Sequence, residues 1–574
     1  MQTLFIVSHT HWDREWYEPF QIFRARLVQC IDQLLTIFET NPDYKYFMLD
    51  GQTIVLEDYL EVRPQREQAL RDLIVAGKLH IGPWYILPDE FLVSGEAIIR
   101  NLQRGIRLAR NVGRVMQVGY IPDPFGHISQ MPQILRGFGL NTAILRRGLA
   151  DEPTELWWQA SDGTRVLLCY LRNSYDNLAF VPRDPAGFIE AIEEQRTALT
   201  PHTLTENLLL MNGTDHMEPW ANLPQLLNAA REQIRDTQII HASLPMYVAH
   251  VQNDIAAQSV NLPIVKGELR NPKRHHLLPG VLSTRMWLKQ RNAHAQTLLE
   301  KWAEPFTAIA TFNLEPLTLN AALVGLAWKY LLQNQPHDSI CGCSVDQVHA
   351  EMATRFDWVE QIAEHVIANS LTTIASQIDT RSTMSGQAIV VFNPTCTTRT
   401  DCVETILDIP DKFSILDEQG NPLPFQVTHR SGKQTHLEFI APNVPGLGYR
   451  TFYVAHRSLE SKQLDAFPPS RVIENEFYRI QADANDGTLI IVDKTTGTKF
   501  SGIHRFVDGG DRGDLYNYCP LENDTLIRQP SAPPRIITEH SPARQALHIT
   551  ITYHLPAQLG AERNARASEW VDEK

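Results

Sequence analysis

The chain has 574 residues, of which 43% are hydrophobic and 21% are charged, a balance typical of a globular protein with more than one domain. Its net charge of −14 repels phosphate backbones and argues against a nucleic-acid partner. No apolar run approaches the ~20 residues that span a bilayer, and the seven cysteines do not form a disulfide framework. Because the N-terminus also lacks the basic lead and cleavage site of a signal peptide, we expect a cytoplasmic protein without membrane contact.

Residues 1–265 predict an α/β domain in which short apolar strands alternate with amphipathic helices. Residues 96–110 show the helical spacing, with apolar side chains every three or four positions. This alternation indicates a mostly parallel, barrel-like sheet, and such sheets carry function on the loops after the strand carboxyl ends. The strand candidates are LFIVS, YFMLDG, LHIGPWY, VGYIPD, TAILRRG, RVLLCYL and LLLMNGTD.

Residues 266–380 predict a three-helix bundle. Its helices are expected around residues 287–309, 321–333 and 345–366, where apolar residues keep helical spacing over several turns. We expect this bundle to complete a metal site that begins in the first domain.

Residues 381–574 predict a β-sandwich region. FYRIQAD and TLIIVD flank the turn Asn485–Asp486–Gly487, which is typical of a hairpin, and Pro468–Pro469 marks a boundary inside the region. The sandwich looks truncated, because ALHITITYHL is the last clear strand and a polar tail follows it. We therefore expect unpaired strand edges and a tendency to associate.

The first chemical motif, HTHWDREW, comes directly after the first strand. If extended geometry continues, His9, His11 and Asp13 point to one side, because side chains alternate along a strand. A His and an Asp two residues apart at a strand end form half of a metal site. The alternative is a surface His–Asp pair in a loop, which the position after the strand and the aromatic residues of the same turn disfavour.

Two more strands end in an acidic residue. Asp123 follows a strand in YIPDPFGHISQMP, where Pro124 prevents the ladder from continuing, and Asp215 ends LLLMNGTD. Each Asp taken alone could equally cap a following helix. Three strand ends that carry His and Asp, Asp, and Asp together indicate one shared crevice.

The fourth motif is LLQNQPHDSICGCSVDQVH. Pro336 ends a helix, and His337 and Asp338 follow at once, so His337 can complete a metal site from a second layer. Cys341 and Cys343 suggest a rival metal site, but a lone CxC lacks a second pair of thiols. We interpret these two as structural thiols.

Taken together and in this order, HTHWDREW, PDPFGH, NGTDH and QPHDSICGCSVD resemble glycoside hydrolase family 38, the α-mannosidases, and look most like its bacterial cytoplasmic branch. The resemblance covers almost the whole chain. Each segment alone is a weak signal, whereas the ordered set is highly specific.

The resemblance implies a role for each matching residue. One divalent metal ion, zinc in most of the family, would be held by His11, Asp13, Asp123 and His337. Asp123 would also be the nucleophile, and Asp215 the general acid and base. Contacts to the sugar or the nucleophile would come from Trp16, Arg147, Tyr175, Asp176, Asp338 and Tyr516.

Two of these assignments are less specific. The residues between the Asp and the Trp of HWDREW differ from those of animal relatives, which weakens the match at Trp16. Arg146 stands beside Arg147, which leaves the arginine open by one residue.

The implied activity is metal-dependent, retaining hydrolysis of terminal α-mannosides through a covalent glycosyl-enzyme intermediate. A metal-dependent deacetylase on a related α/β scaffold is one alternative, but it would not need Asp215. A carbohydrate-binding protein with a dead site is another, but both catalytic acids are present. The sequence leaves open the linkage, a mannose or glycerate aglycone, cobalt or manganese in place of zinc, and whether the chain forms a homo-oligomer.

Overall fold

The computed structural model describes residues 1–312, 319–381, 386–455, 470–541 and 543–573. These residues divide into two compact units. The first contains Met1–Glu300, Leu319–His365 and Leu515–Asn517, and the second contains Lys301–Thr318, Val366–Asp514 and Tyr518–Lys574. The three domains expected from the sequence remain a prediction, and the Pro468–Pro469 boundary lies outside the described residues.

The predicted α/β fold of the N-terminal region is confirmed, and its strands are shared between two five-stranded sheets. In the first sheet β1 is central and every pair is parallel. All eight residues of β1 are buried, so both faces of this strand are covered, which explains its apolar run. The strands are β1 (Thr3–Thr10), β2 (Phe47–Leu49), β3 (Leu79–His80), β8 (Asn207–Asn212) and β9 (Gln238–Ala242).

The second sheet has the order β10-β6-β7-β5-β4 and is parallel except for the β6–β7 pair. One hydrophobic cluster takes Phe5 and Val7 from the first sheet and Tyr120, Ile144 and Leu167 from the second. The two sheets therefore enclose a common core, as a barrel does. The strands are β4 (Gly119–Ile121), β5 (Thr142–Leu145), β6 (Glu155–Gln159), β7 (Arg165–Tyr170) and β10 (Ile264–Lys266).

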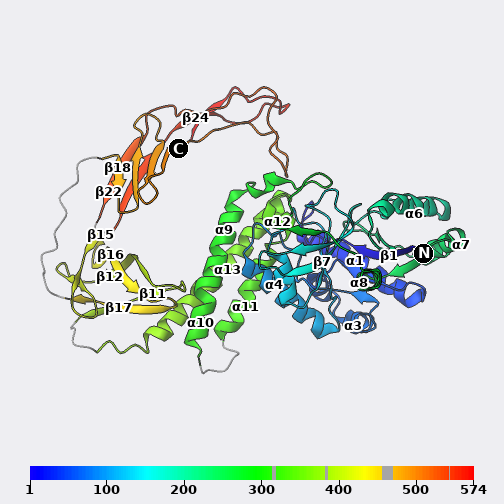
Figure 1. Cartoon of the computed structure of the whole chain (residues 1–574). Coiled ribbons are helices and arrows are strands. Elements are labelled where there is room, and N and C mark those ends of the chain that lie inside the picture. Colours follow the sequence, from blue (N-terminus) through cyan, green and yellow to red (C-terminus); the bar gives the residue numbers. More distant parts are fainter. Residues whose placement is uncertain (313–318, 382–385, 456–469, 542, 574) are drawn as a thin grey trace. The chain divides into compact units, whose positions relative to one another are not determined.

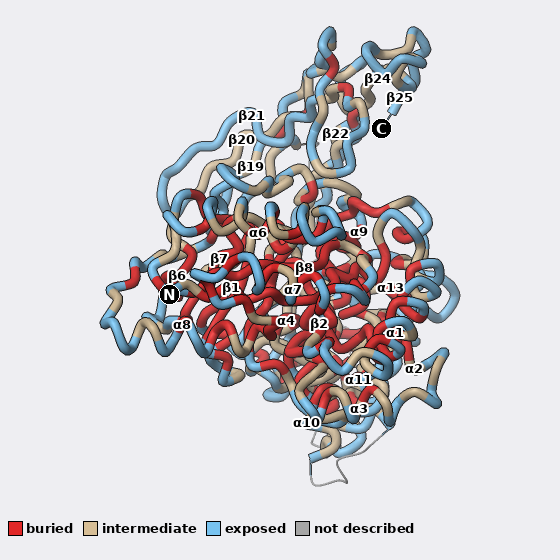
Figure 2. Tube along the Cα trace, turned by 90° about the vertical axis from the view of Figure 1, so that its right-hand side faces the viewer, coloured by how far each residue is buried: buried red, intermediate tan, exposed pale blue. Residues whose placement is uncertain are grey.

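Helices accompany these sheets, and Figure 2 shows buried stretches gathered around β1, β2 and β8. In α4 the Ser94 side chain accepts a hydrogen bond from Ala97 N, which satisfies one amide at the start of the helix. The helices are α1 (Phe20–Thr40), α2 (Ile54–Leu60), α3 (Glu67–Val75), α4 (Gly95–Val112), α5 (Met131–Gly137), α6 (Pro185–Leu199), α7 (Leu223–Gln233) and α8 (Leu244–Gln258), with 3-10 turns at Pro64–Arg66, Thr200–His202 and Pro279–Leu282.

A helical region follows, drawn in green in Figure 1. The helix expected around residues 287–309 is interrupted by a π-helical segment, Leu298–Ala303, which ends two residues before Pro305. Proline lacks an N–H and clashes with the preceding turn, which accounts for the wider turn there. The helices are α9 (Met286–Thr297), α10 (Glu304–Ala310), α11 (Leu319–Gln333), α12 (His337–Cys341) and α13 (Asp346–Ala375). Among the described residues, none of the helices is both long enough and apolar enough to span a membrane.

The remaining chain forms antiparallel sheets. A four-stranded and a three-stranded sheet share a core that includes Ile415, Phe439 and Phe452, as a β-sandwich requires. The first sheet contains β11 (Gln387–Asn393), β13 (Ser414–Leu416), β14 (Pro422–Leu423) and β17 (Gly448–Ala455), and the second contains β12 (Arg399–Asp408), β15 (Phe425–Ser431) and β16 (Gln434–Val444).

A further antiparallel sheet contains the predicted hairpin, which is formed by β19 and β20. Two separate strand pairs, β22–β23 and β24–β25, come after it along the chain. The strands are β18 (Val472–Glu474), β19 (Tyr478–Ala482), β20 (Leu489–Asp493), β21 (Lys499–Ile503), β22 (Arg535–His540), β23 (Gln545–Thr550), β24 (Tyr553–Pro556) and β25 (Trp570–Glu573).

Candidate metal centre and active site

The carboxyl ends of the strands bring the sequence motifs together. Backbone pairing of β1 continues to His11, whose N donates to Thr214 O at 3.0 Å and whose O accepts from His216 N at 2.8 Å. His11 and Asp215 thereby face each other across an isolated parallel bridge. The first and third motifs are adjacent because β1 and β8 are neighbours in the sheet.

The four predicted metal ligands converge. His11 Nε2 lies 3.1 Å from Asp13 Oδ1, and His337 Nε2 lies 3.5 Å from both Asp13 Oδ1 and Asp123 Oδ2. The two imidazole rings are nearly parallel, with centroids 5.6 Å apart. Donor atoms of His11, Asp123 and His337 all lie within 4.8 Å of one another.

These atoms fit a divalent cation. His337 Nε2 and Asp13 Oδ2 are buried and have no hydrogen-bond partner among the described residues. Buried polar atoms without a partner are costly, and a cation would satisfy them. Two imidazoles and two carboxylates form a donor set that suits zinc and also admits cobalt or manganese.

Asp50, which the sequence did not single out, belongs to this centre. It follows β2, and its Oδ2 lies 2.8 Å from His11 Nδ1 and accepts from Trp12 N at 2.9 Å. A carboxylate on the second nitrogen of an imidazole fixes the tautomer and orientation of the ring. The signal was present in YFMLDG, another predicted strand that ends in an acid.

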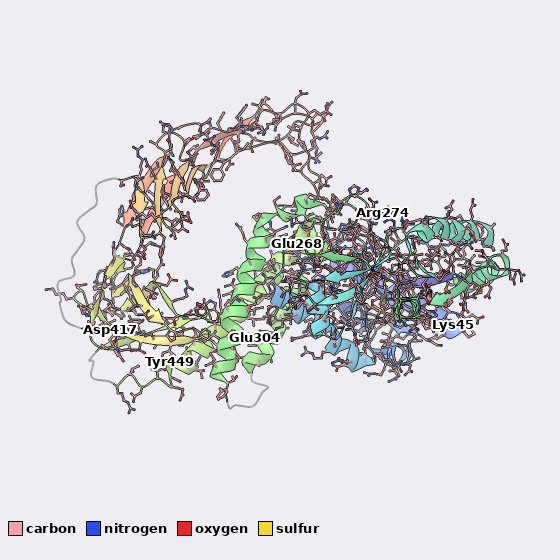
Figure 3. The ribbon with its side chains drawn as sticks, viewed as in Figure 1. Lys45, Glu268, Arg274, Glu304, Asp417 and Tyr449 are labelled. Atoms are coloured by element: carbon pink, nitrogen blue, oxygen red, sulfur yellow. The ribbon has the colours of Figure 1, made fainter. Side chains whose placement is uncertain are left out.

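Both arginines between which the sequence left the assignment open contact Asp123. Arg147 donates to Asp123 Oδ1 through Nε at 2.9 Å and Nη2 at 2.6 Å, and Arg146 Nη1 reaches the same oxygen at 3.3 Å. A basic loop holds both arginines, since Arg147 also donates to His276 O and Arg146 Nε to His275 Nδ1 at 3.5 Å. This loop follows Glu268 and includes Arg274, both labelled in Figure 3.

The two candidate catalytic carboxyls differ in proton affinity. Burial alone would raise the pKa of Asp123, but Arg147, His337 and Arg146 overcome this effect and hold it well below its ordinary value. Burial raises the pKa of Asp215 to about 6, against an opposing effect of His11. Asp123 therefore stays ionised under conditions in which Asp215 can carry a proton.

Tyr175 and Asp176 border Asp215. Tyr175 is buried, and its Oη donates to Asp215 Oδ1 at 2.8 Å while the Arg146 guanidinium lies over its ring. Asp176 is half-buried at the edge of the group, where Thr214 Oγ1 donates to its Oδ2 at 3.5 Å.

Asp338 lies beside the candidate metal ligand His337, with Oδ2 3.6 Å from His337 Nε2. Burial raises its pKa to about 7, although His337 opposes the change. The Cys343 thiol donates to Asp338 Oδ1 at 3.2 Å, and the Cys341 thiol to Asp89 Oδ2 at 3.6 Å. Burial raises the pKa of both thiols well above the ordinary value, which agrees with a structural role.

Trp16 and Tyr516 meet although 500 residues separate them. Trp16 Nε1 donates to Tyr516 Oη at 2.8 Å, and the Tyr516 ring lies edge-on to Phe125, with centroids 6.3 Å apart. Phe125 in turn is edge-on to His337 at 5.5 Å. Both predicted aromatic residues thus belong to the first unit, and the Phe125 ring lies between Tyr516 and the candidate metal ligand His337.

Comparison with known proteins gives a consistent result. Residues 1–268 match the model of the glycosyl hydrolases family 38 N-terminal domain, and residues 276–374 match the alpha mannosidase middle domain. The putative mannosylglycerate hydrolase of Halalkalibacterium halodurans is 34% identical over 90% of this chain and 64% of its own length. Mouse alpha-mannosidase 2C1 is 23% identical over 63% of this chain and 34% of its own length. The chain thus spans less than two thirds of either relative.

Two solved structures are also similar. An alpha-mannosidase from Enterococcus faecalis V583 superposes with a TM-score of 0.91 at 28% identity, covering 100% of this chain and 71% of that one. A glycosyl hydrolase family 38 protein from Enterococcus faecalis gives a TM-score of 0.82 at 27% identity, covering 100% and 70%. The predicted resemblance is confirmed: this chain belongs to glycoside hydrolase family 38.

Proposed function

We propose that the chain is a metal-dependent, retaining exo-α-mannosidase that removes terminal α-mannose from oligosaccharides or small mannosyl conjugates. One observation carries this proposal: Asp123, which lies among the candidate metal ligands His11, Asp13 and His337, and the nearby Asp215 have pKa values shifted in opposite directions. A deacetylase would need only one acid near a metal-bound water, so that alternative function would give Asp215 no catalytic role.

The chemistry follows from the two carboxyls. Asp123 attacks the anomeric carbon as the bond to the aglycone breaks, and Asp215 gives its proton to the leaving oxygen. Asp215, now ionised, then takes a proton from water, which attacks the same carbon and releases the sugar from Asp123. Two displacements retain the configuration. Arg147 and Arg146 keep Asp123 ionised and orient its Oδ1.

His11, Asp13, Asp123 and His337 would hold the cation. When bound, a divalent ion would coordinate and orient sugar hydroxyls and so favour the distorted ring of the transition state. The half-buried Trp16, fixed by its hydrogen bond to Tyr516, offers an apolar face to the C–H side of the sugar.

A specific observation favours a second substrate with an acidic aglycone. The relative from Halalkalibacterium halodurans carries the name of a putative mannosylglycerate hydrolase. In this chain the Arg146 side chain lies beside Asp123 and is 20% exposed, whereas Arg147 is buried. The Arg146 guanidinium is therefore the positive group that a substrate can reach. A carboxylate on a small aglycone would be attracted to it.

A substrate panel tests both proposals. It contains α-linked mannobiosides of each linkage, an α-mannosylglycerate and an acetylated sugar, with the first product anomer read by NMR. Release of α-mannose supports the main proposal, and release of acetate alone contradicts it. If Arg146→Gln lowers kcat/KM for mannosylglycerate more than for the mannobiosides, the acidic aglycone is supported. An equal loss on both contradicts it.

A further inference from the structure

Two charged residues of HTHWDREW take no part in the proposed chemistry and are nevertheless buried. Arg14 is 8% exposed and Glu15 only 1%. Burial of a charge is unfavourable unless the charge is paired and hydrogen-bonded. Both residues, which follow the proposed metal ligand Asp13 in the sequence, therefore need partners that neutralise and hydrogen-bond their buried charges.

Glu15 is bound by two segments that lie more than 300 residues away in the sequence. Arg355 of α13, itself 6% exposed, donates through both terminal nitrogens, one to each carboxylate oxygen, and Nη1 reaches Oε2 at 3.0 Å. Ser339 Oγ donates to Glu15 Oε1 at 3.0 Å. The paired guanidinium–carboxylate geometry fixes orientation as well as distance.

Arg355 extends this connection to the other side of His337. Its Nε donates to Asn334 Oδ1 at 2.5 Å, and Asn334 Nδ2 donates to Met352 O at 3.0 Å. Asn334 stands three residues before His337 and Ser339 two residues after it. The Glu15–Arg355 pair therefore holds the turn that carries His337 at both ends and joins it to the loop that carries Asp13.

The metal site needs such a connection. His337 Nε2 is 3.5 Å from Asp13 Oδ1 and 3.5 Å from Asp123 Oδ2, so the ligands come from distant segments that must meet closely. Asp13, Asp123 and Asp338 are buried together, and their like charges repel before a cation binds. An ion pair that forms without the cation can hold the Asp13 loop and the His337 turn together.

We infer that Glu15 and Arg355 are positioning residues for the metal site, which set the distance between the Asp13 loop and the His337 turn. The inference rests on the metal site of the proposed function. It predicts that the pair acts on metal affinity and not only on folding stability.

The same motif contains a matched control. Arg14 donates to Asp58 through Nε at 2.8 Å and Nη2 at 3.1 Å, and both residues are buried. This pair ties the loop to α2, which carries none of the proposed metal ligands. Loss of the Arg14–Asp58 pair should therefore lower stability without moving His337 relative to Asp13.

The experiment measures the Zn²⁺ dissociation constant of the purified chain, stripped of metal, by competition with a chromogenic chelator, together with thermal melting. Glu15→Gln and Arg355→Met should each weaken Zn²⁺ binding by about 10–100-fold, the usual effect of losing an outer-shell partner. The double variant should lose less than the product of the two single losses, because the residues act as a pair. Asp58→Asn should lower the melting temperature and keep the dissociation constant within about threefold of wild type.

If the single variants fail to fold, Ser339→Ala still decides, because it removes one hydrogen bond to Glu15 and keeps the ion pair. A several-fold weaker dissociation constant supports the inference, and an unchanged one overturns it. Equal weakening in Asp58→Asn and Glu15→Gln also overturns it, as does a wild-type chain that binds no Zn²⁺. A chain that binds Zn²⁺ but cleaves no mannoside contradicts the proposed activity alone, and the dissociation constants still decide the role of the pair.

Discussion

Tyr175 Oη donates a 2.8 Å hydrogen bond to Asp215 Oδ1, which connects the proposed proton donor to a side chain that is not ionised near neutral pH. This bond stabilises the ionised form of Asp215 and so opposes the rise that burial causes in its pKa, to about 6. The contact makes the pH dependence of the reaction sensitive to a single hydroxyl group.

Tyr175→Phe should therefore move the alkaline limb of kcat/KM to higher pH. Asp215 must be protonated to act as an acid, so activity falls as pH rises through its pKa, and removal of the Tyr175 donor raises that pKa further. We also expect kcat/KM to fall about tenfold at the optimum, the effect of one lost hydrogen bond to a charged group. A pH–rate profile on an aryl mannoside checks this. Tyr59→Phe is the control, because it removes a 2.6 Å Tyr–Asp hydrogen bond to Asp32 elsewhere.

Asp215→Ala and Asp123→Ala should fail in different ways. Loss of a general acid costs about 10²–10⁴-fold and matters most for poor leaving groups, so activated aryl mannosides should be partly spared in Asp215→Ala. External azide should restore turnover in that variant. Asp123→Ala removes the proposed nucleophile and a proposed metal ligand together, so neither an activated leaving group nor azide should restore turnover. Steady-state rates over a series of leaving groups decide, and equal losses that azide cannot restore would leave Asp215 without its proposed role.

Removal of the metal should abolish activity, and Zn²⁺, Co²⁺ or Mn²⁺ should restore it. The reason is the convergence of His11, Asp13, Asp123 and His337, whose carboxylates repel one another without a cation. Dialysis against a chelator, followed by titration of each metal, gives the measurement, and melting curves before and after show that the fold survives. Full activity after chelation contradicts the metal site, and β-mannose as the first product contradicts Asp123 as the nucleophile.

Much of the N-terminal fold follows from local patterns. All seven predicted strands are present, and all of them except the two-residue β3 are apolar runs in which almost every residue is buried. The antiparallel strand β6 (ELWWQ) was missed, although Asp162–Gly163 before β7 is a hairpin signal. β9 (QIIHA) is short and partly polar, and becomes a strand only because β1 offers it an edge.

The candidate site likewise contains residues that could be predicted from the sequence and contacts that could not. His11, Asp13, Asp123 and Asp215 could be proposed from their positions after strands, because parallel strands end at one edge of a sheet. The contact of Asp50 with His11 could not be predicted from the sequence, because it depends on β2 being the neighbour of β1 in the sheet. Glu15 and Arg355 are 340 residues apart, and only the tertiary structure makes them a pair.

Acid should destabilise the fold in part through His241, a buried residue of β9 distant in sequence from every proposed metal ligand. Its Nδ1 accepts from Lys45 N at 3.3 Å, which leaves the proton on Nε2 for the 3.0 Å contact with Ser8 Oγ. Burial lowers the pKa of His241 to about 4, below the 6.5 of an exposed histidine. Its contribution to stability is thus complete above pH 6.5 and is lost as pH falls toward 4, by up to about 3 kcal/mol.

His241→Gln should accordingly melt at a lower temperature than wild type at pH 7.5. Its melting temperature should also fall by less than that of wild type between pH 7.5 and pH 5. Melting curves at both pH values give the comparison, with His294→Gln on the exposed side of α9 as the control. If wild type and His241→Gln lose the same amount over this range, the buried neutral imidazole is not a source of the acid sensitivity.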